Sequence, residues 1–161
     1  MNAGRPNGTI MRGRQRGVAA IEFALVFIVL FSVLYALATF GAVFYTQQAV
    51  TRAAEEGART ASLVTAPASG DQRVLDAVYD ALANSLVVPV SENSSVSARR
   101  SWIVSNVNVT AIPNGLGAGS TFVVTVSYPY SANRLLPKIP LVDQWMPDQL
   151  RSRSTIALRS S

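Results

Sequence analysis

The hydrophobic pattern of this chain is dominated by one long apolar run near its N-terminus. No charged residue occurs between residues 23 and 51, and nearly every position from 17 to 45 is apolar. A helix rises about 1.5 Å per residue and the hydrocarbon core of a bilayer is about 30 Å thick, so about 20 apolar residues span it. The run therefore predicts a membrane-spanning helix that begins near Val18.

The helical pattern continues past the apolar run into a more polar stretch. From 46 to 62 there is no proline and no turn signal, and mostly small side chains recur at steps of three and four. We therefore predict one long helix over 18–62, membrane-spanning in its first half and amphipathic in its second. Because a stripe of small residues lets another backbone approach closely, either the chain's own domain or another subunit packs on it. The stripe consists of Val43, Gln47, Val50, Ala54, Gly57 and Ala61.

A second, shorter helix is predicted after a break rich in proline, glycine and serine at 66–70. Ser69 followed by Gln72 fits a capping box, which predicts a helix over about 71–85. Its apolar face is formed by Val74, Leu75, Val78, Ala81 and Leu82.

The pattern after the second helix is typical of strands. The stretch 120–130 alternates cleanly between apolar and polar residues, and 113–119 is a glycine-rich hairpin connection before it. Further strand-like segments are 86–90, 102–112 and 152–159. We therefore predict an α+β fold, in which the long N-terminal helix carries a small domain with a second helix and a short antiparallel sheet.

Charge is concentrated at the start of the chain. The net charge is +5, and four arginines with no acid precede Gly17, including Arg12, Arg14 and Arg16. Without them, ten bases face nine acids, so the basic character is a topology signal and indicates no nucleic-acid partner. By the positive-inside rule, these arginines hold the N-terminus in the cytoplasm and place the C-terminal domain outside.

Composition excludes the commonest catalytic and metal sites. The chain contains no cysteine and no histidine, so disulfides, cysteine nucleophiles, histidine triads and the usual zinc sites are absent. The single lysine, Lys138, lies between two prolines and is a poor partner for a Ser–Lys dyad. Asp76 and Asp80 are expected on a solvated helix face, and Arg99–Arg100 at the end of a loop. We therefore predict no catalytic residue, no metal and no cofactor, and hence not an enzyme.

Glu22 is the most informative residue in the apolar run. A carboxylate inside a membrane helix costs a few kcal/mol and marks a functional site by default, although one near the interface can snorkel to water. If the chain is cut after Gly17, Glu22 lies in the first turns of the shortened helix, near the new α-amine of Val18. The carboxylate could then pair with the amine of a neighbouring subunit, and such a buried pair fixes register more than it stabilises.

Three interpretations of the apolar helix compete. It is a plain anchor, or a secretory signal peptide cut after Ala38 in the small-x-small pattern Ala36–Leu37–Ala38, or a helix freed by a cut at Gly17. The signal-peptide interpretation is weakened because the apolar run is longer than usual and continues to Tyr45.

The sequence from 16 to 23, RGVAAIEF, followed by an apolar helix, resembles the N-terminus of type IV pilins and pseudopilins. The wider stretch 16–62 is similar to the TadE-like family, minor pseudopilins of the tight-adherence (Tad, or Flp-type) pilus machinery of bacteria. Resemblance is looser beyond 62, where TVSYPY at 125–130 and LRSRS at 150–154 look like the family's C-terminal pattern.

This resemblance implies a minor pseudopilin that acts in assembly of a Tad-type pilus for adhesion or secretion. It implies cleavage by prepilin peptidase between Gly17 and Val18, and roles in assembly for Glu22 and Phe23. The implied partners are that peptidase, other pilins and pseudopilins, the inner-membrane assembly platform and the lipid bilayer.

The resemblance also implies three segments and a location for each. A leader at 1–17 is removed, the helix at 18–62 crosses the bacterial inner membrane once, and the α+β domain at 63–161 lies in the periplasm or enters the pilus. The main alternative is an unprocessed single-pass membrane-anchored periplasmic protein whose outer domain binds a partner.

Overall fold

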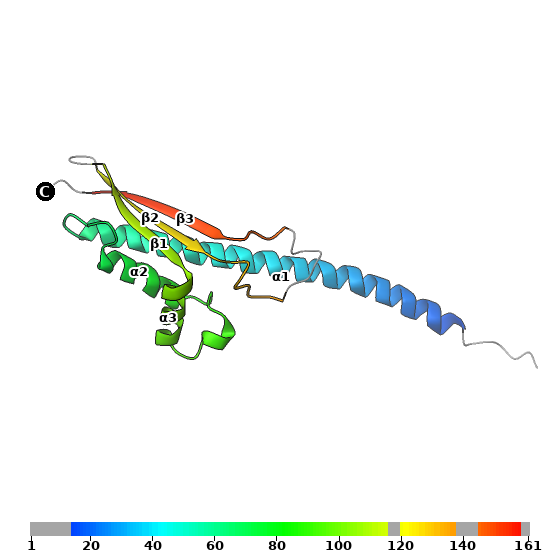
Figure 1. Cartoon of the computed structure of the whole chain (residues 1–161). Coiled ribbons are helices and arrows are strands. Elements are labelled where there is room, and N and C mark those ends of the chain that lie inside the picture. Colours follow the sequence, from blue (N-terminus) through cyan, green and yellow to red (C-terminus); the bar gives the residue numbers. More distant parts are fainter. Residues whose placement is uncertain (1–13, 116–119, 138–144, 159–161) are drawn as a thin grey trace, which may run out of the picture. The chain divides into compact units, whose positions relative to one another are not determined.

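The computed structural model describes residues 14–115, 120–137 and 145–158, with side chains from Gly17 onward. The chain divides into two compact units, 1–38 and 39–161, and the first helix contributes to both. The elements, drawn in Figure 1, are α1 (Arg14–Leu63), α2 (Gln72–Ala83), the 3₁₀ turn η1 (Val90–Glu92), α3 (Val96–Asn106), β1 (Asn108–Asn114), β2 (Thr121–Tyr128) and β3 (Leu150–Ala157). The predicted α+β class is confirmed, with one long apolar helix and an antiparallel sheet.

The first unit is the apolar part of α1, and its side chains are uncovered by the chain itself. Every residue from 17 to 34 is exposed. Ser32 donates a hydrogen bond to the carbonyl of Ile28 (2.7 Å), so its hydroxyl is satisfied within the helix. Internal hydrogen bonding of polar groups is the main requirement for a helix that crosses a hydrocarbon layer, and Ser32 meets it.

The second unit is built around a three-stranded antiparallel sheet in the order β1-β2-β3. Alternate residues of the central strand, among them Phe122, Val124 and Val126, are fully buried on the inner face. The predicted strand, with Phe122, Val124 and Val126 on one face, is therefore confirmed, although its burial does not alternate. Val123 and Thr125, on the outer face, are also shielded, because the neighbouring strands flank them on both sides.

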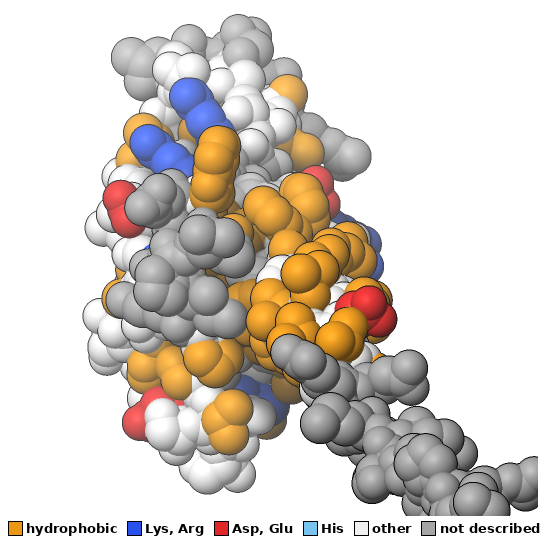
Figure 2. Space-filling model, turned by 90° about the vertical axis from the view of Figure 1, so that its right-hand side faces the viewer, with side chains coloured by type: hydrophobic (Ala, Val, Ile, Leu, Met, Phe, Trp, Pro, Cys, Tyr) orange, Lys and Arg blue, Asp and Glu red, His pale blue; other side chains and the backbone are white. Residues whose placement is uncertain are grey.

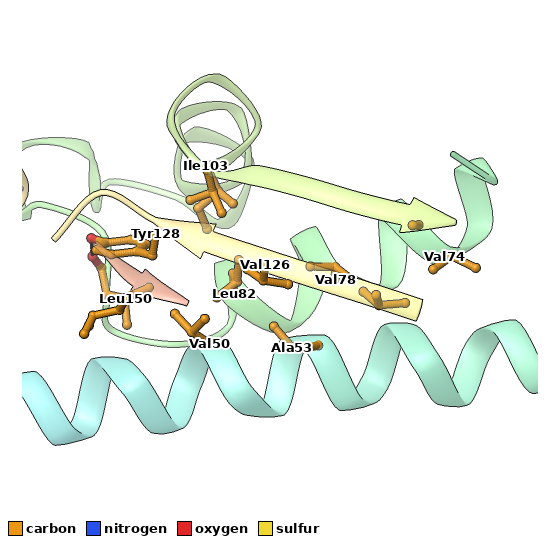
Figure 3. Close-up of a cluster of buried hydrophobic side chains, with 14 of the residues drawn as sticks. Val50, Ala53, Val74, Val78, Leu82, Ile103, Val126, Tyr128 and Leu150 are labelled. Carbon is orange, nitrogen blue, oxygen red and sulfur yellow. Dashed lines mark hydrogen bonds between the residues drawn. The ribbon is translucent and has the colours of Figure 1, made fainter. Parts of the chain in front are cut away.

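Helices α1 and α2 supply the other side of the core, as Figure 3 shows. Val50 and Ala53 point from α1 toward the sheet, while Val78 and Leu82 enter from α2 and Ile103 from α3. These side chains are all fully buried. The second unit therefore has a hydrophobic core of its own, to which the outer half of α1 belongs.

The small-residue stripe of α1 packs on the chain's own domain. Val50, Ala54, Gly57 and Ala61 are all buried. A Cβ added at Gly57 would lie 2.5 Å from Cγ2 of Val78 and 3.1 Å from Cγ1 of Val124. Glycine is therefore needed where α1 passes beneath α2 and β2, and this part of the stripe is filled within the subunit.

The strand expected over 102–112 is wrong in its first half, where the chain forms the end of α3. Ser95 caps this helix by accepting a hydrogen bond from the amide of Ala98 (3.1 Å), and Ile103 anchors it in the core. The apolar run 86–90 is likewise no strand: it is a turn leading into η1. Capping and tertiary burial override the β-propensity of tryptophan, isoleucine and valine here.

The N-cap of α2 is Asp71 and not Ser69. Oδ1 of Asp71 accepts a hydrogen bond from the amide of Arg73 (3.0 Å), and the Arg73 guanidinium bonds the same carboxylate. The hydrogen bond from the Arg73 side chain lowers the pKa of Asp71. The predicted helix is thus confirmed, with its start defined by a different side chain.

Arg100 lies on α3 and joins it to α2, which corrects the expectation of a loop-end charge pair. Its guanidinium contacts Asp76 Oδ1 at 2.6 Å and also pairs with Asp80. The two acids therefore form a bridge between helices and not simply a solvated face. The shared cation offsets the repulsion between two carboxylates one helical turn apart.

Tyr128 closes the end of the core near α3. Its hydroxyl donates to the carbonyl of Val87 (2.5 Å), and its ring lies 6.2 Å from that of Trp102. Burial raises the pKa of Tyr128, with a smaller contribution from Tyr130. The bond satisfies a buried carbonyl in the segment that connects α2 to η1.

Candidate functional site

The expected processing site lies in the first turns of α1. The helix begins at Arg14, so Gly17 and Val18 are already helical. Val18 is 57% exposed, and a Cβ placed on Gly17 would have nothing within 4 Å. No other part of the described chain therefore covers the bond between these two residues.

Two of the three arginines assigned to topology are placed by the structure. Arg14 and Arg16 belong to the first turn of α1, next to the apolar stretch. Arg12 lies outside the described residues, as do Lys138 and the glycines 117 and 119 of the hairpin connection. The topology role of the arginines stays a prediction.

Glu22 is exposed on α1, and no other acidic residue is close to it in the sequence. In the sequence it is the only acid between residues 17 and 54. Within the described residues it forms no ion pair with the rest of the chain. In a bilayer such a carboxylate is costly unless the interface, water, an amine or another molecule supplies a partner.

Phe23 begins a row of aromatic rings along one face of α1. It stacks on Phe27 with ring centroids 6.1 Å apart, Phe27 on Phe31 at 6.1 Å, and Phe31 on Tyr35 at 6.3 Å. The spacing of four residues brings successive rings to the same side of the helix. Glu22 and Phe23, as consecutive residues, lie on adjacent faces.

The exposed surface of this helix is almost wholly hydrophobic. Figure 2 looks along the molecule from the N-terminal side, and orange side chains cover the end of the described helix that faces the viewer. Among the described residues, one helix is long and apolar enough to cross a membrane, and the whole of its most apolar window is uncovered within the chain. The arrangement is consistent with a protein anchored by a single membrane pass.

Comparison with known families agrees with this description. The family model for TadE-like protein matches residues 17–59, a segment that begins at the expected cleavage site and ends within the small-residue stripe. The resemblance found in the sequence is therefore confirmed over this segment, which matches the TadE-like family model. The family points to involvement in Tad pilus systems and to association with the membrane and with pilus components.

The match ends before α2, so the sheet lies outside it. No curated protein and no solved structure matches the chain. What the domain after 63 does must therefore be argued from its own surfaces.

The sequence analysis missed two features of α1, and only the first of them has a local signal. The aromatic row follows from rings at 23, 27, 31 and 35, a spacing of four that is readable directly. Gln47 is the second feature: its Nε2 donates to the carbonyl of Arg151 (3.2 Å) and ties α1 to β3. No local pattern predicts a contact between residues so far apart in the chain.

Proposed function

We propose that this protein is a minor pseudopilin that acts in the assembly of a Tad-type pilus. In this proposal it inserts in the bacterial inner membrane with its N-terminus in the cytoplasm, and prepilin peptidase cuts it between Gly17 and Val18. It is then a substrate of a protease and a structural component, not an enzyme. The family match over 17–59 supports the pilus system.

The observation that carries the proposal is the isolated carboxylate of Glu22 on an uncovered apolar helix. Cleavage after Gly17 would create an α-amine on Val18, one helical turn before Glu22. The Val18 amine of the same chain and that of a neighbouring subunit are then the new cations nearest to the Glu22 carboxylate. A charge pair between subunits removes the penalty of an unpaired carboxylate in the membrane and fixes the axial register of the helices.

The remaining parts of the fold suit this role. The apolar face of α1 is uncovered from 17 to 34, as a helix that packs among lipids or other helices requires. The small-residue stripe is filled by the sheet domain, so the domain is attached rigidly to the outer half of the helix. Insertion of the first unit would then carry the second with it.

Replacing Glu22 by alanine tests the proposed role directly. We expect membrane insertion and leader removal to continue, because alanine is compatible with both the helix and the bilayer. Incorporation should fall at least about tenfold, since the loss of one buried charge pair exceeds about 1.4 kcal/mol. The measurement is the amount of this chain that co-purifies with the other pilus subunits.

The matched controls are Glu22→Asp and Ser32→Ala. Aspartate keeps the charge and should retain part of the incorporation, whereas Ser32 bonds only within its own helix and its loss should change little. Unchanged co-purification of the Glu22→Ala chain would show that the carboxylate has no part in assembly.

The boundary between the two compact units in the sequence favours a second candidate function. The second unit begins at Thr39, directly after the small-x-small pattern that ends at Ala38. A cut there would release residues 39–161 with their core complete. This candidate is an exported soluble domain, and it predicts that the protein is found free in the periplasm.

A further inference from the structure

The pairing of β3 with β2 determines which backbone N–H and C=O groups of β3 point away from the sheet. In an antiparallel ladder, successive residues point their N–H and C=O groups alternately toward the partner strand and away from it. The amide of Leu158 donates to the carbonyl of Ser120 (2.9 Å), and the register continues as Thr121 opposite Ala157. The even-numbered residues of β3 therefore bond to β2, and the odd-numbered ones point outward.

The contact with Gln47 agrees with this assignment. The carbonyl of Arg151, an odd-numbered residue, accepts its hydrogen bond from α1 and not from β2. By the same alternation, the N–H and C=O groups of Arg153, Thr155 and Ala157 point away from the sheet. All three residues are exposed, and within the described chain these outward groups have no hydrogen-bond partner.

The opposite edge of the sheet is blocked at two of its outward positions. The outward carbonyl of Ala111 on β1 accepts a hydrogen bond from the amide of Gly70 (2.8 Å). Pro113, also in an outward position, has no N–H to offer. Such features protect an edge against pairing with another strand, and β3 contains no proline.

The outer face beside the open edge is basic. Arg151 and Arg153 are exposed there, two residues apart on the same side of β3. Among the described residues of this face there is no acid. Its members are Asn108, Thr110 and Ile112 from β1, Val123, Thr125 and Ser127 from β2, and Arg151, Arg153 and Thr155 from β3.

This charge disfavours pairing with a second copy of the same strand. In an antiparallel pair of β3 edges centred between residues 152 and 154, arginines from both copies would lie on one face, diagonal or directly opposite to each other, and like charges so placed repel. A strand with carboxylates at alternate positions would instead set an acid beside each arginine. Opposite charges across strands stabilise the pair.

We propose that the β3 edge is a docking site for an extended acidic segment of a partner protein. The segment adds a fourth strand to the sheet, bonding the outward groups of Arg153, Thr155 and Ala157, and its alternate carboxylates pair with Arg151 and Arg153. The backbone bonds supply affinity, and the arginines select an acidic partner over a basic one. This inference rests on the second unit alone and is independent of the pilus proposal.

The test uses the full chain in detergent micelles and a fluorescent nine-residue peptide of alternating valine and glutamate, capped at both ends. We expect saturable binding by fluorescence anisotropy. We also expect slower amide hydrogen exchange at Arg153 and Thr155, with no change at Ala111 on the opposite edge. A peptide of alternating valine and lysine should bind at least about tenfold more weakly.

The decisive control is the same acidic peptide with every backbone N–H methylated. It keeps the charge but loses the hydrogen-bond donors of the strand, so it should bind at least about tenfold more weakly. Equal binding of the two peptides would mean charge attraction alone and would overturn the proposal. Absence of binding by the unmodified peptide would overturn it as well.

A pair of variants at one position tests the same point from the protein's side. Thr155→Pro removes an outward N–H at a position where an edge strand tolerates proline, and should weaken peptide binding at least about tenfold. Thr155→Ala keeps the N–H and should bind within about twofold of the natural chain. Equal affinities of the two variants would exclude backbone pairing at this edge.

Discussion

A chain carrying Gly17→Leu is expected to keep its leader and to stay at full length in a cell that contains prepilin peptidase. The resemblance implies that the peptidase requires a small residue at this position. The space around Gly17 is open, so leucine would meet no other part of the described chain. Any effect of the substitution should therefore come from the peptidase and not from misfolding.

The expected loss of processing is essentially complete, and assembly should be lost with it because the Val18 amine is never formed. The measurement is the length of the membrane-inserted chain on a gel, together with its co-purification with pilus subunits. Gly17→Ala is the matched control and should still be cut. Processing of the Gly17→Leu chain to the normal length would contradict the proposed cleavage site.

The same experiment separates the proposal from its main alternative. For an unprocessed membrane anchor, Gly17→Leu and the natural chain should have the same length and the same partners. The function would then reside in the outer domain, where the open edge of β3 offers the clearest docking surface.

Gly57→Leu is expected to disrupt the second unit. The first added carbon alone would lie 2.5 Å from the Val78 side chain and 3.1 Å from Val124. Both neighbours are fully buried valines with little freedom to move aside. Overpacking of this kind typically costs about 1–3 kcal/mol and sometimes more, which is a large share of a stability of about 5–15 kcal/mol.

The measurement is urea unfolding of the full chain in detergent, followed by the fluorescence of Trp102, which packs near Tyr128. Gly41→Leu is the matched control on the same helix, since nothing lies within 4 Å of a Cβ there. Both changes gain the same helix propensity, about 1 kcal/mol, so their difference isolates the clash. Equal stability of the two variants would mean that α1 does not pack tightly beneath α2 and β2.

The long helix and the central strand were predictable because their patterns are long and regular. The charge-free run from 23 to 51 leaves few alternatives to a helix. The alternation in 120–130 predicts a strand, because a period of two places its apolar side chains on one face of a sheet. Glu22 could also be identified from the sequence, because one acid in such a run is conspicuous. Its partner could not be identified, since the nearest arginine, Arg16, precedes it by six residues and the sequence of one chain does not show which amine pairs with it.

The elements that were missed depend on contacts distant in sequence. The residues of α3 include Trp102 and Val104, which favour strands locally, yet Ile103 is drawn into a core built mainly by other elements. Arg100 meets acids that lie 20 and 24 residues earlier in the chain. The small-residue stripe of α1 predicted that another segment packs closely on this helix. The spacing of the small residues does not distinguish a segment of the same chain from one of another subunit.

The central claim is tested most directly by the N-terminal sequence of the protein from its native membrane, with and without prepilin peptidase. The account predicts a chain that starts at Val18 when the peptidase is present and at or near Met1 when it is absent. A chain that starts at or near Met1 in both cells, or at Thr39 in both, would contradict it.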